Sequence, residues 1–293
     1  MFPRFQIMLV SSMLLLMVFI LLSWNTMDRL NRFSANQQVL ESALLKGAGN
    51  QLLQRIQDLQ TRVLLFSEEH HPQIAKLVQY PDNAALRVAM QQRVKRHFPD
   101  YSNFMLADAN GFVKFTEQAP PISEHCQNDL LRFSQMSRQH GADHLHPLYT
   151  HPHQSQHHIN IMSPFLNQRG LKQEGIFLVS FKAHILAQIL ADYELPGYQL
   201  MLLKQDDPGL IEITAKGGRE TLQRAHQLDR AEQRSIHQHL QIPGSLWKLV
   251  VLSSPALYQN YQQSALLEAA LVLGLVLFVT FLIVRIAWLS YRC

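Results

Sequence analysis

Two uninterrupted apolar runs stand near the ends of the chain. Residues 5–24 carry no charge, and residues 265–289 carry only Glu268 near one end and Arg285 near the other. Each run has about the twenty residues that a helix needs to cross a bilayer, so both predict transmembrane helices. The first run exceeds the usual length of a signal-peptide core, and no small-residue cleavage site follows it, which favours an uncleaved anchor.

The positive charges that flank the two runs predict their orientation. Arg4 precedes the first run, while Arg285 and Arg292 lie at the far end of the second. Because cytoplasmic flanks are enriched in Lys and Arg, we expect residues 1–4 and 290–293 in the cytoplasm and the central region outside. A bacterial inner membrane with a periplasmic domain is the simplest setting. This topology separates Cys126 from Cys293, so no disulfide between them is expected.

Apolar residues next recur at spacings of three and four, which is typical of an amphipathic helix over residues 27–66. Gly47 and Gly49 weaken the pattern in its middle. A helix that rises directly from a membrane span packs on its own domain or pairs with a second copy, so the segment favours a homodimer without establishing a coiled coil. The regular part of the stripe consists of Leu52, Ile56, Leu59, Val63 and Phe66.

After a second helix at residues 83–97, the period changes to that of strands. Asn110-Gly111 between two apolar runs predicts a hairpin, because both residue types tolerate positive φ. Short polar connections between the later strands predict an antiparallel meander. The expected strands are 103–108, 112–116, 146–150, 159–166 and 175–181, with helices at 128–140 and 183–190.

A smaller set of strands follows, at residues 198–204, 210–215 and 247–253, with a helix at 229–240. The fold class predicted is α+β, with one five-stranded antiparallel unit and one smaller unit nearer the membrane. The expected division is residues 25–97 for the juxtamembrane and long helices, 98–190 for the distal unit, 191–255 for the proximal unit and 256–264 for a linker.

This order of elements resembles a known family, the double Cache (PAS-like) extracytoplasmic sensors of bacterial histidine kinases, diguanylate cyclases and chemoreceptors. The resemblance implies two PAS-like antiparallel-sheet units on a long N-terminal helix, and a small-molecule pocket in the distal unit. By the same resemblance Tyr149, His151 and Asn160 would line that pocket, and Tyr101 would lie near its mouth. The stretches that carry it are FPDYSNFMLADANGFV, INIMSPFLNQRGLKQEGIFLVSF, GYQLMLLKQDDPG and IPGSLWKLVVLSSP.

Histidine is concentrated in HLHPLYTHPHQSQHHINIM, where residues 144–162 hold six of the fifteen histidines. A hairpin there could bring two or three imidazoles within reach of a metal ion or form a pH switch. No acidic or cysteine partner lies in the run beyond Asp143, so we predict no metal site and expect the tip histidines, residues 153–158, to face solvent. Residues 68–71, Glu-Glu-His-His, are interpreted as a solvated helix end.

The catalytic motifs that were sought do not occur in the sequence: no phosphate-binding loop, no G-x-S-x-G elbow and no H-E-x-x-H helix. The turn that begins at Asp108 is not a calcium loop, because the twelfth position is Ala119 and not a glutamate. The net charge of +4 is modest, and no basic patch interleaved with aromatic residues suggests nucleic acid. We therefore expect neither an enzyme nor a resident cofactor.

The prediction is a membrane-anchored sensor that binds a small ligand in its distal unit and signals through its spanning helices. Only four residues follow Leu289, so the output domain of a two-component system or diguanylate cyclase is expected outside this sequence. It would lie either on a cytoplasmic or membrane partner or in a longer protein of which this chain is the sensor portion. The alternative is an envelope scaffold or assembly protein whose periplasmic domain binds another protein.

Overall fold

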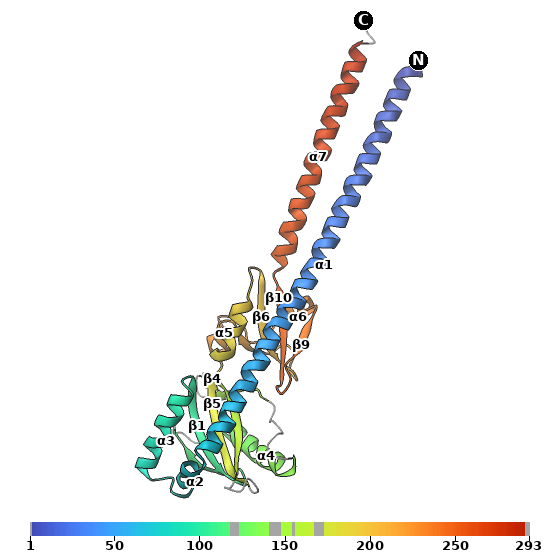
Figure 1. The fold of residues 1–293 in the computed structure, drawn as a ribbon. Helices are drawn as coiled ribbons and strands as arrows, with labels where there is room; N and C mark the ends of the chain where they lie inside the picture. Colours follow the sequence, from blue (N-terminus) through green and yellow to red (C-terminus); the bar gives the residue numbers. More distant parts are fainter. Residues whose placement is uncertain (1, 118–122, 141–147, 154–155, 167–172, 291–293) are drawn as a thin grey trace. The chain divides into compact units, whose positions relative to one another are not determined.

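The computed structural model describes residues 2–117, 123–140, 148–153, 156–166 and 173–290 (Figure 1). It divides into two compact units, one made of Met1–Ser42 with Ser253–Cys293 and the other of Ala43–Leu252. The first unit contains the two predicted spans, and the second contains both sheets.

Two long helices form the first unit. Helix α1 (Phe2–Glu69) begins here and continues into the second unit, and α7 (Pro255–Ser290) is the other. The helices pair through an ion pair between Arg29 Nη1 and Glu268 Oε2 at 2.6 Å, and through the rings of Phe33 and Tyr261, stacked with centroids 4.1 Å apart. By length and composition both helices can cross a membrane, and their most apolar windows are unburied within the structure.

The first sheet is antiparallel and has the strand order β2-β1-β5-β4-β3. Its strands confirm the predicted meander, since β3, β4 and β5 follow one another in the sheet, while β1 closes onto β5. The bounds are β1 (Tyr101–Asp108), β2 (Val113–Thr116), β3 (Thr150–His153), β4 (Gln156–Leu166) and β5 (Gln173–Lys182).

The hairpin between β1 and β2 has the turn that the sequence predicts. The Asp108 carboxylate accepts hydrogen bonds from the backbone N–H groups of Asn110 at 2.9 Å and Phe112 at 3.0 Å. Gly111 has φ +88°, a conformation that favours glycine. Asp108 thus stabilises the turn, because its carboxylate accepts hydrogen bonds from two backbone N–H groups.

One face of this sheet packs against α1. The predicted stripe of α1 is buried, and the Phe66 ring stacks on Phe177 of β5 at 5.2 Å. Farther along, Ser67 Oγ and Ser163 Oγ of β4 form a buried hydrogen bond of 2.9 Å. The same face receives α2 (His71–Gln79), while α3 (Ala84–His97) packs on α2 and is capped by the Asn83 side chain. This face carries several buried phenylalanine rings, among them Phe104 and Phe177.

The opposite face is covered by α4 (Glu124–His140). Its inward side chains form an apolar cluster with alternate residues of β1, β4 and β5. The cluster comprises Met105, Ala107, Cys126, Leu130, Phe133, Met162, Ile176 and Leu178.

The second sheet has the order β8-β7-β6-β10-β9 and is preceded by α5 (His184–Tyr193). As in the first sheet, its first strand lies beside its last. Its strands are β6 (Tyr198–Lys204), β7 (Ile211–Thr214), β8 (Gly217–Gly218), β9 (His239–Gln241) and β10 (Trp247–Ser253), with the 3-10 turn η1 (Arg219–Thr221). The α+β prediction with two antiparallel sheets is confirmed.

Two local predictions were wrong. The helix expected at 229–240 is α6 (Arg230–Ser235) only, because residues 239–241 pair with β10 as β9. Its start is well defined, since Asp229 and Glu232 form a capping box. The strand expected at 146–150 begins only at Thr150, and Leu148 instead makes an isolated parallel bridge to Ser245, between β9 and β10. Residues 146–147 lie outside the described residues.

The glycines in the middle of α1 do not interrupt it. A Cβ on Gly47 would lie 2.5 Å from Tyr193 Cε1, and one on Gly49 would lie 2.2 Å from Leu240 Cδ2. Glycine at these positions therefore lets α5 and β9 approach the helix closely, at a cost of about 1 kcal/mol each in helix propensity. The two glycines that weaken the helical pattern of the sequence are therefore required for packing.

Candidate functional site

A row of polar side chains crosses the α4 face of the first sheet. Asn160 of β4 stands opposite Ser180 of β5, and Ser180 stands opposite Asn103 of β1. Directly paired residues share a face, and alternate residues of a strand do so too. The three side chains therefore lie on the face of Met105 and Leu178, beneath α4.

The row is buried and only partly satisfied. Ser180 Oγ donates to Asn160 Oδ1 at 2.7 Å, and Asn160 Nδ2 lies 4.0 Å from Cys126 Sγ of α4. The Oδ1 of Asn103 is buried and has no hydrogen-bond partner among the described residues. An unsatisfied buried acceptor costs about 1–3 kcal/mol, so this polar row does not help to hold an apolar core together.

Tyr149 and Asp129 extend the polar row toward β3. Tyr149 precedes Thr150, which pairs with Ile159, so its backbone continues the register opposite Asn160. The Tyr149 hydroxyl donates to Oδ2 of Asp129, a carboxylate on α4 that is only 3% exposed. Burial and the Asp129 charge raise the pKa of Tyr149, so the phenol stays protonated and donates.

Cys126 lies one helical turn before Asp129. Burial, and then the Asp129 charge, raise the pKa of its thiol to about 11. The thiol is therefore neutral near pH 7 and acts as a weak hydrogen-bonding group beside Asn160. We define the polar row as Asn103, Cys126, Asp129, Tyr149, Asn160 and Ser180.

Tyr101 lies at the start of β1 and has a different partner. Its hydroxyl donates to Glu117 Oε1 at 2.9 Å, and burial followed by Glu117 raises its pKa. The second carboxylate oxygen of Glu117 is buried and has no hydrogen bond within the described residues. Tyr101 shares the end of β1 with Asn103, but a register shift separates the two.

Of the four residues named from the sequence, the structure places Tyr149 and Asn160 in one row and Tyr101 near its end. His151 pairs with His158 through the backbone, and its side chain lies outside the described part of the structure. Asn103, Ser180, Asp129 and Cys126 were missed. Asn103 could have been found by its alternation with Met105 and Ala107, since a polar residue at an inward position of a buried strand stands out.

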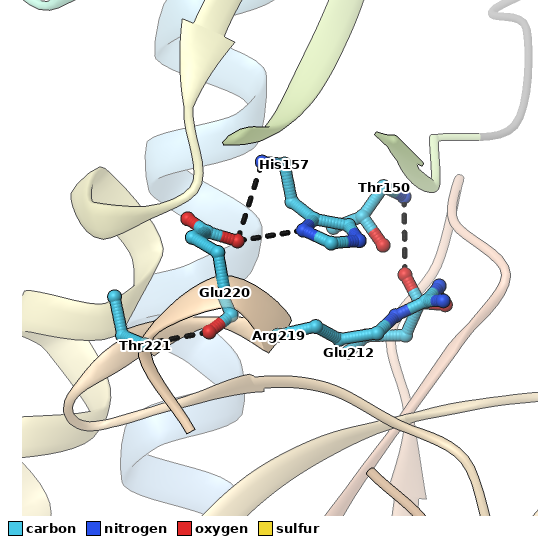
Figure 2. A network of polar contacts seen from close by, with 7 residues as sticks. Thr150, His157, Glu212, Arg219, Glu220 and Thr221 are labelled. Atoms are coloured by element: carbon cyan, nitrogen blue, oxygen red, sulfur yellow. Dashed lines mark hydrogen bonds and ion pairs between the residues drawn. The ribbon is translucent and has the colours of Figure 1, made fainter. Parts of the chain in front are cut away.

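A second polar group joins the two sheets (Figure 2). Glu212 of β7 is 1% exposed and forms an ion pair with Arg219 of η1. Its Oε2 also accepts a 3.3 Å hydrogen bond from the backbone N–H of Thr150, at the start of β3. Burial raises the pKa of Glu212, while the Arg219 charge and the Thr150 N–H oppose this effect.

The His-rich segment contributes to the same junction. His157 Nδ1 lies 2.6 Å from Glu220 Oε2, and the backbone N–H of His157 donates to the same oxygen at 3.2 Å (Figure 2). The expectation that the tip histidines face solvent is wrong for His157, whose side chain is 15% exposed, because Glu220 of η1 covers it. Residues 144 and 146 lie outside the described residues. We call the contacts of Thr150, His157, Glu212, Arg219 and Glu220 the sheet junction.

No family model matches the chain, and no curated protein matches it. Among solved structures, it is similar to the ligand-binding domain of the Pseudomonas fluorescens chemoreceptor CtaA in complex with L-isoleucine (11% identity, 78% of this chain and 98% of that one, TM-score 0.48). It is also similar to the ligand-binding domain of the Pseudomonas aeruginosa amino acid chemoreceptor PctB with L-Gln (10%, 74% and 91%, TM-score 0.48). A third is the sensor domain of the Vibrio cholerae histidine kinase DctB (10%, 74% and 98%, TM-score 0.47).

These proteins are of the kind that the sequence resembles, sensor domains of bacterial receptors. Their TM-scores lie below 0.5, and we therefore base the function on the side chains of this chain.

Proposed function

We propose that the chain is a membrane-anchored sensor that binds a small polar ligand at the polar row beneath α4. The observation that carries the proposal is the row itself, a line of buried polar side chains on a sheet face that is otherwise apolar. Asn103 Oδ1 has no partner within the described residues, and a ligand donor would satisfy it. The opposite face of the same sheet is packed with aromatic rings against α1.

The chemistry of the row suits a ligand with both donors and acceptors. Asn160 and Asn103 offer amide groups, Ser180 and Tyr149 offer hydroxyls, and Asp129 offers a buried carboxylate that favours a ligand with a donor or a positive charge. Such a site acts by recognition, and we propose a receptor and not an enzyme.

Transmission is proposed to run from β3 to the second sheet. Tyr149 of the polar row is adjacent in the chain to Thr150, whose N–H is bound to Glu212 of the sheet junction. A ligand that draws Tyr149 and Asp129 toward itself would displace the start of β3 and so change the junction. For this to signal, the ligand must bind the two arrangements with different affinity.

The output is proposed to lie with a partner in the membrane or cytoplasm, reached through the helices of the first unit, and the receptor is proposed to act as a homodimer. With two candidate spans flanking the sheets, the inner membrane with the sheets in the periplasm is the proposed location.

The test is a thermal-shift screen of the full chain in nanodiscs against amino acids and organic carboxylates. A ligand that binds only the folded state, present at a concentration of 100 times its Kd, stabilises that state by about 2.7 kcal/mol and so raises Tm measurably. Hydrogen exchange with the ligand bound should then show new protection in α4 and in the residues of β3, β4 and β5 around the row.

A scaffold would give the opposite outcome. No compound would move Tm, and a second envelope protein would remain bound through purification of the full chain. Protection confined to an exposed surface, with α4 unchanged, would also contradict the sensor proposal.

A further inference from the structure

A second cluster of side chains with ligand chemistry lies on the other face of the first sheet, away from the polar row. Glu69, His70 and His97 each offer one ligand atom, and these atoms all lie within 4.8 Å of one another. Glu69 ends α1, His97 ends α3, and His70 lies between α1 and α2. We define these three residues as the His-Glu cluster.

The backbone explains why neighbouring residues can serve one site. Adjacent residues within a helix point in different directions. His70 has φ −103° and ψ 17°, which departs from helical geometry, so the chain turns between Glu69 and the first residue of α2. The interpretation of residues 68–71 as a solvated helix end is wrong for His70, which is 7% exposed.

His70 has an unmet bonding capacity. Its Nε2 is buried and has no hydrogen-bond partner among the described residues. Burial lowers the pKa of the ring, with Arg93 and His97 acting in the same direction and Glu69 opposing them. The buried, unpartnered Nε2 is therefore the ring atom that a ligand could bind.

The ring of His97 is oriented by a contact within α3. Its Nδ1 lies 3.0 Å from the backbone carbonyl oxygen of Arg93, so Nδ1 carries the proton and Nε2 keeps its lone pair. Metal-bound histidines commonly use this second contact, in which the other ring nitrogen donates to a carbonyl. The Phe66 ring lies against both imidazoles, with centroids 4.4 Å from His70 and 5.1 Å from His97, and shields one side of the cluster.

We propose that Glu69, His70 and His97 form a binding site for a divalent transition metal of the zinc type. Two imidazoles and one carboxylate are ligands that Zn²⁺ accepts, with water completing the tetrahedron. Bond lengths of about 2.0–2.1 Å place tetrahedral ligand atoms about 3.3 Å apart, so the side chains must close inward slightly. Glu69 and His97 are exposed and can rotate to do so.

The site would tie the end of α1 to the end of α3. Because α1 continues into the first unit, a metal bound there would act on the same helix that the proposed sensor uses for transmission. The metal site itself does not depend on the polar row or on its ligand.

The test is a titration of the metal-free full chain, purified without a histidine tag, with Zn²⁺ by calorimetry and with Co²⁺ by visible absorption. We expect one equivalent to bind and Co²⁺ to show the intense d–d bands of a four-coordinate ion. Glu69→Gln and His97→Gln, both at exposed positions, should each weaken this binding at least about tenfold.

Two further variants test the other histidines, and a third tests the positive charge beside the site. His71→Gln changes the adjacent histidine, which pairs with Glu174 at 2.9 Å, and should leave the affinity unchanged. A variant with His144, His146, His151 and His153 all replaced by Gln should still bind one equivalent of Zn²⁺. Arg93→Gln removes a neighbouring positive charge but keeps the backbone carbonyl, and should tighten binding.

Absence of Zn²⁺ binding to the parent chain would overturn the proposal. It would also be overturned if the affinity survived in Glu69→Gln and His97→Gln and was lost only in the four-histidine variant. Neither result would bear on the polar row, which is tested with organic ligands.

Discussion

At the scale of residues, the molecule contrasts two faces of one sheet. On the α1 face, the buried hydroxyls of Ser67 and Ser163 satisfy each other at 2.9 Å. On the α4 face, Asn103 keeps a buried acceptor without a partner in the described structure. Since a buried polar group is costly when unpaired, the α4 face is the one on which a ligand is proposed to bind.

Tyr149→Phe tests the polar contact at the end of the row. The variant keeps the ring and removes the hydroxyl that donates to the buried Asp129 carboxylate, so we expect a loss of about 1–3 kcal/mol in unfolding free energy and weaker ligand binding. Denaturant unfolding measures the first effect. Tyr101→Phe, which removes the bond to the less buried Glu117, is the matched control and should cost less. Equal costs would contradict the burial of the Asp129 contact.

Asn103→Val tests whether the row serves stability or binding. The substitution replaces an unpaired buried acceptor with an apolar side chain suited to a strand, so we expect stability to stay level or rise by about 1 kcal/mol while ligand affinity falls. Thermal unfolding with and without ligand measures both. A large loss of stability with unchanged affinity would show that Asn103 is structural.

Individual site residues were only partly predictable. Asn160 was expected only from the family resemblance, because β4 is buried on both faces and its sequence does not show which side chains face α4. Asp129 and Cys126 reach the row from a helix far away in sequence, and no local pattern gives that contact. His70 was expected at a solvated helix end, but the chain leaves helical geometry at this residue and its ring is buried.

At the scale of elements, the strands with strong apolar character were predicted closely: β4, β5, β6 and β10 differ little from the expected ranges. Short elements that depend on tertiary contacts were not predicted. Strand β9 has three residues and exists because it pairs with β10, and its sequence continued the helical pattern of residues 229–240. Gly47 looked like a weak point of α1, but its role follows only from the position of Tyr193.

The sheet junction yields a prediction at this scale. Arg219→Met leaves the Glu212 carboxylate buried without its cation, so we expect a loss of about 3–5 kcal/mol. Arg224→Met, which breaks the partly exposed pair with Glu232, should cost less than about 1 kcal/mol. Denaturant unfolding of both variants provides the comparison. Similar losses would mean that Glu212 is hydrated and that the junction is loose.

At the scale of the whole molecule, the two apolar helices and the α+β region between them were predictable from periodicity. The first unit adds a contact that the sequence did not suggest, the ion pair between Arg29 and Glu268. The chain contains two helices that are long and apolar enough to span a membrane, and a region of two sheets that carries the polar row. This combination is the basis for the proposed receptor.

The central claim is that the polar row is the ligand site, and one matched comparison tests it most directly. Asn160→Leu with Ser180→Ala removes a buried hydrogen-bonded pair on the α4 face, and Ser67→Ala with Ser163→Ala removes one on the α1 face. Replacing both partners leaves no member of either pair buried without the other, so both chains should fold.

The measurement is the ligand-induced shift in Tm of the full chain in nanodiscs. We predict that the shift disappears in the Asn160→Leu, Ser180→Ala chain and persists in the Ser67→Ala, Ser163→Ala chain. A shift that survives the first pair of substitutions, or is lost equally in both chains, would contradict binding at the polar row.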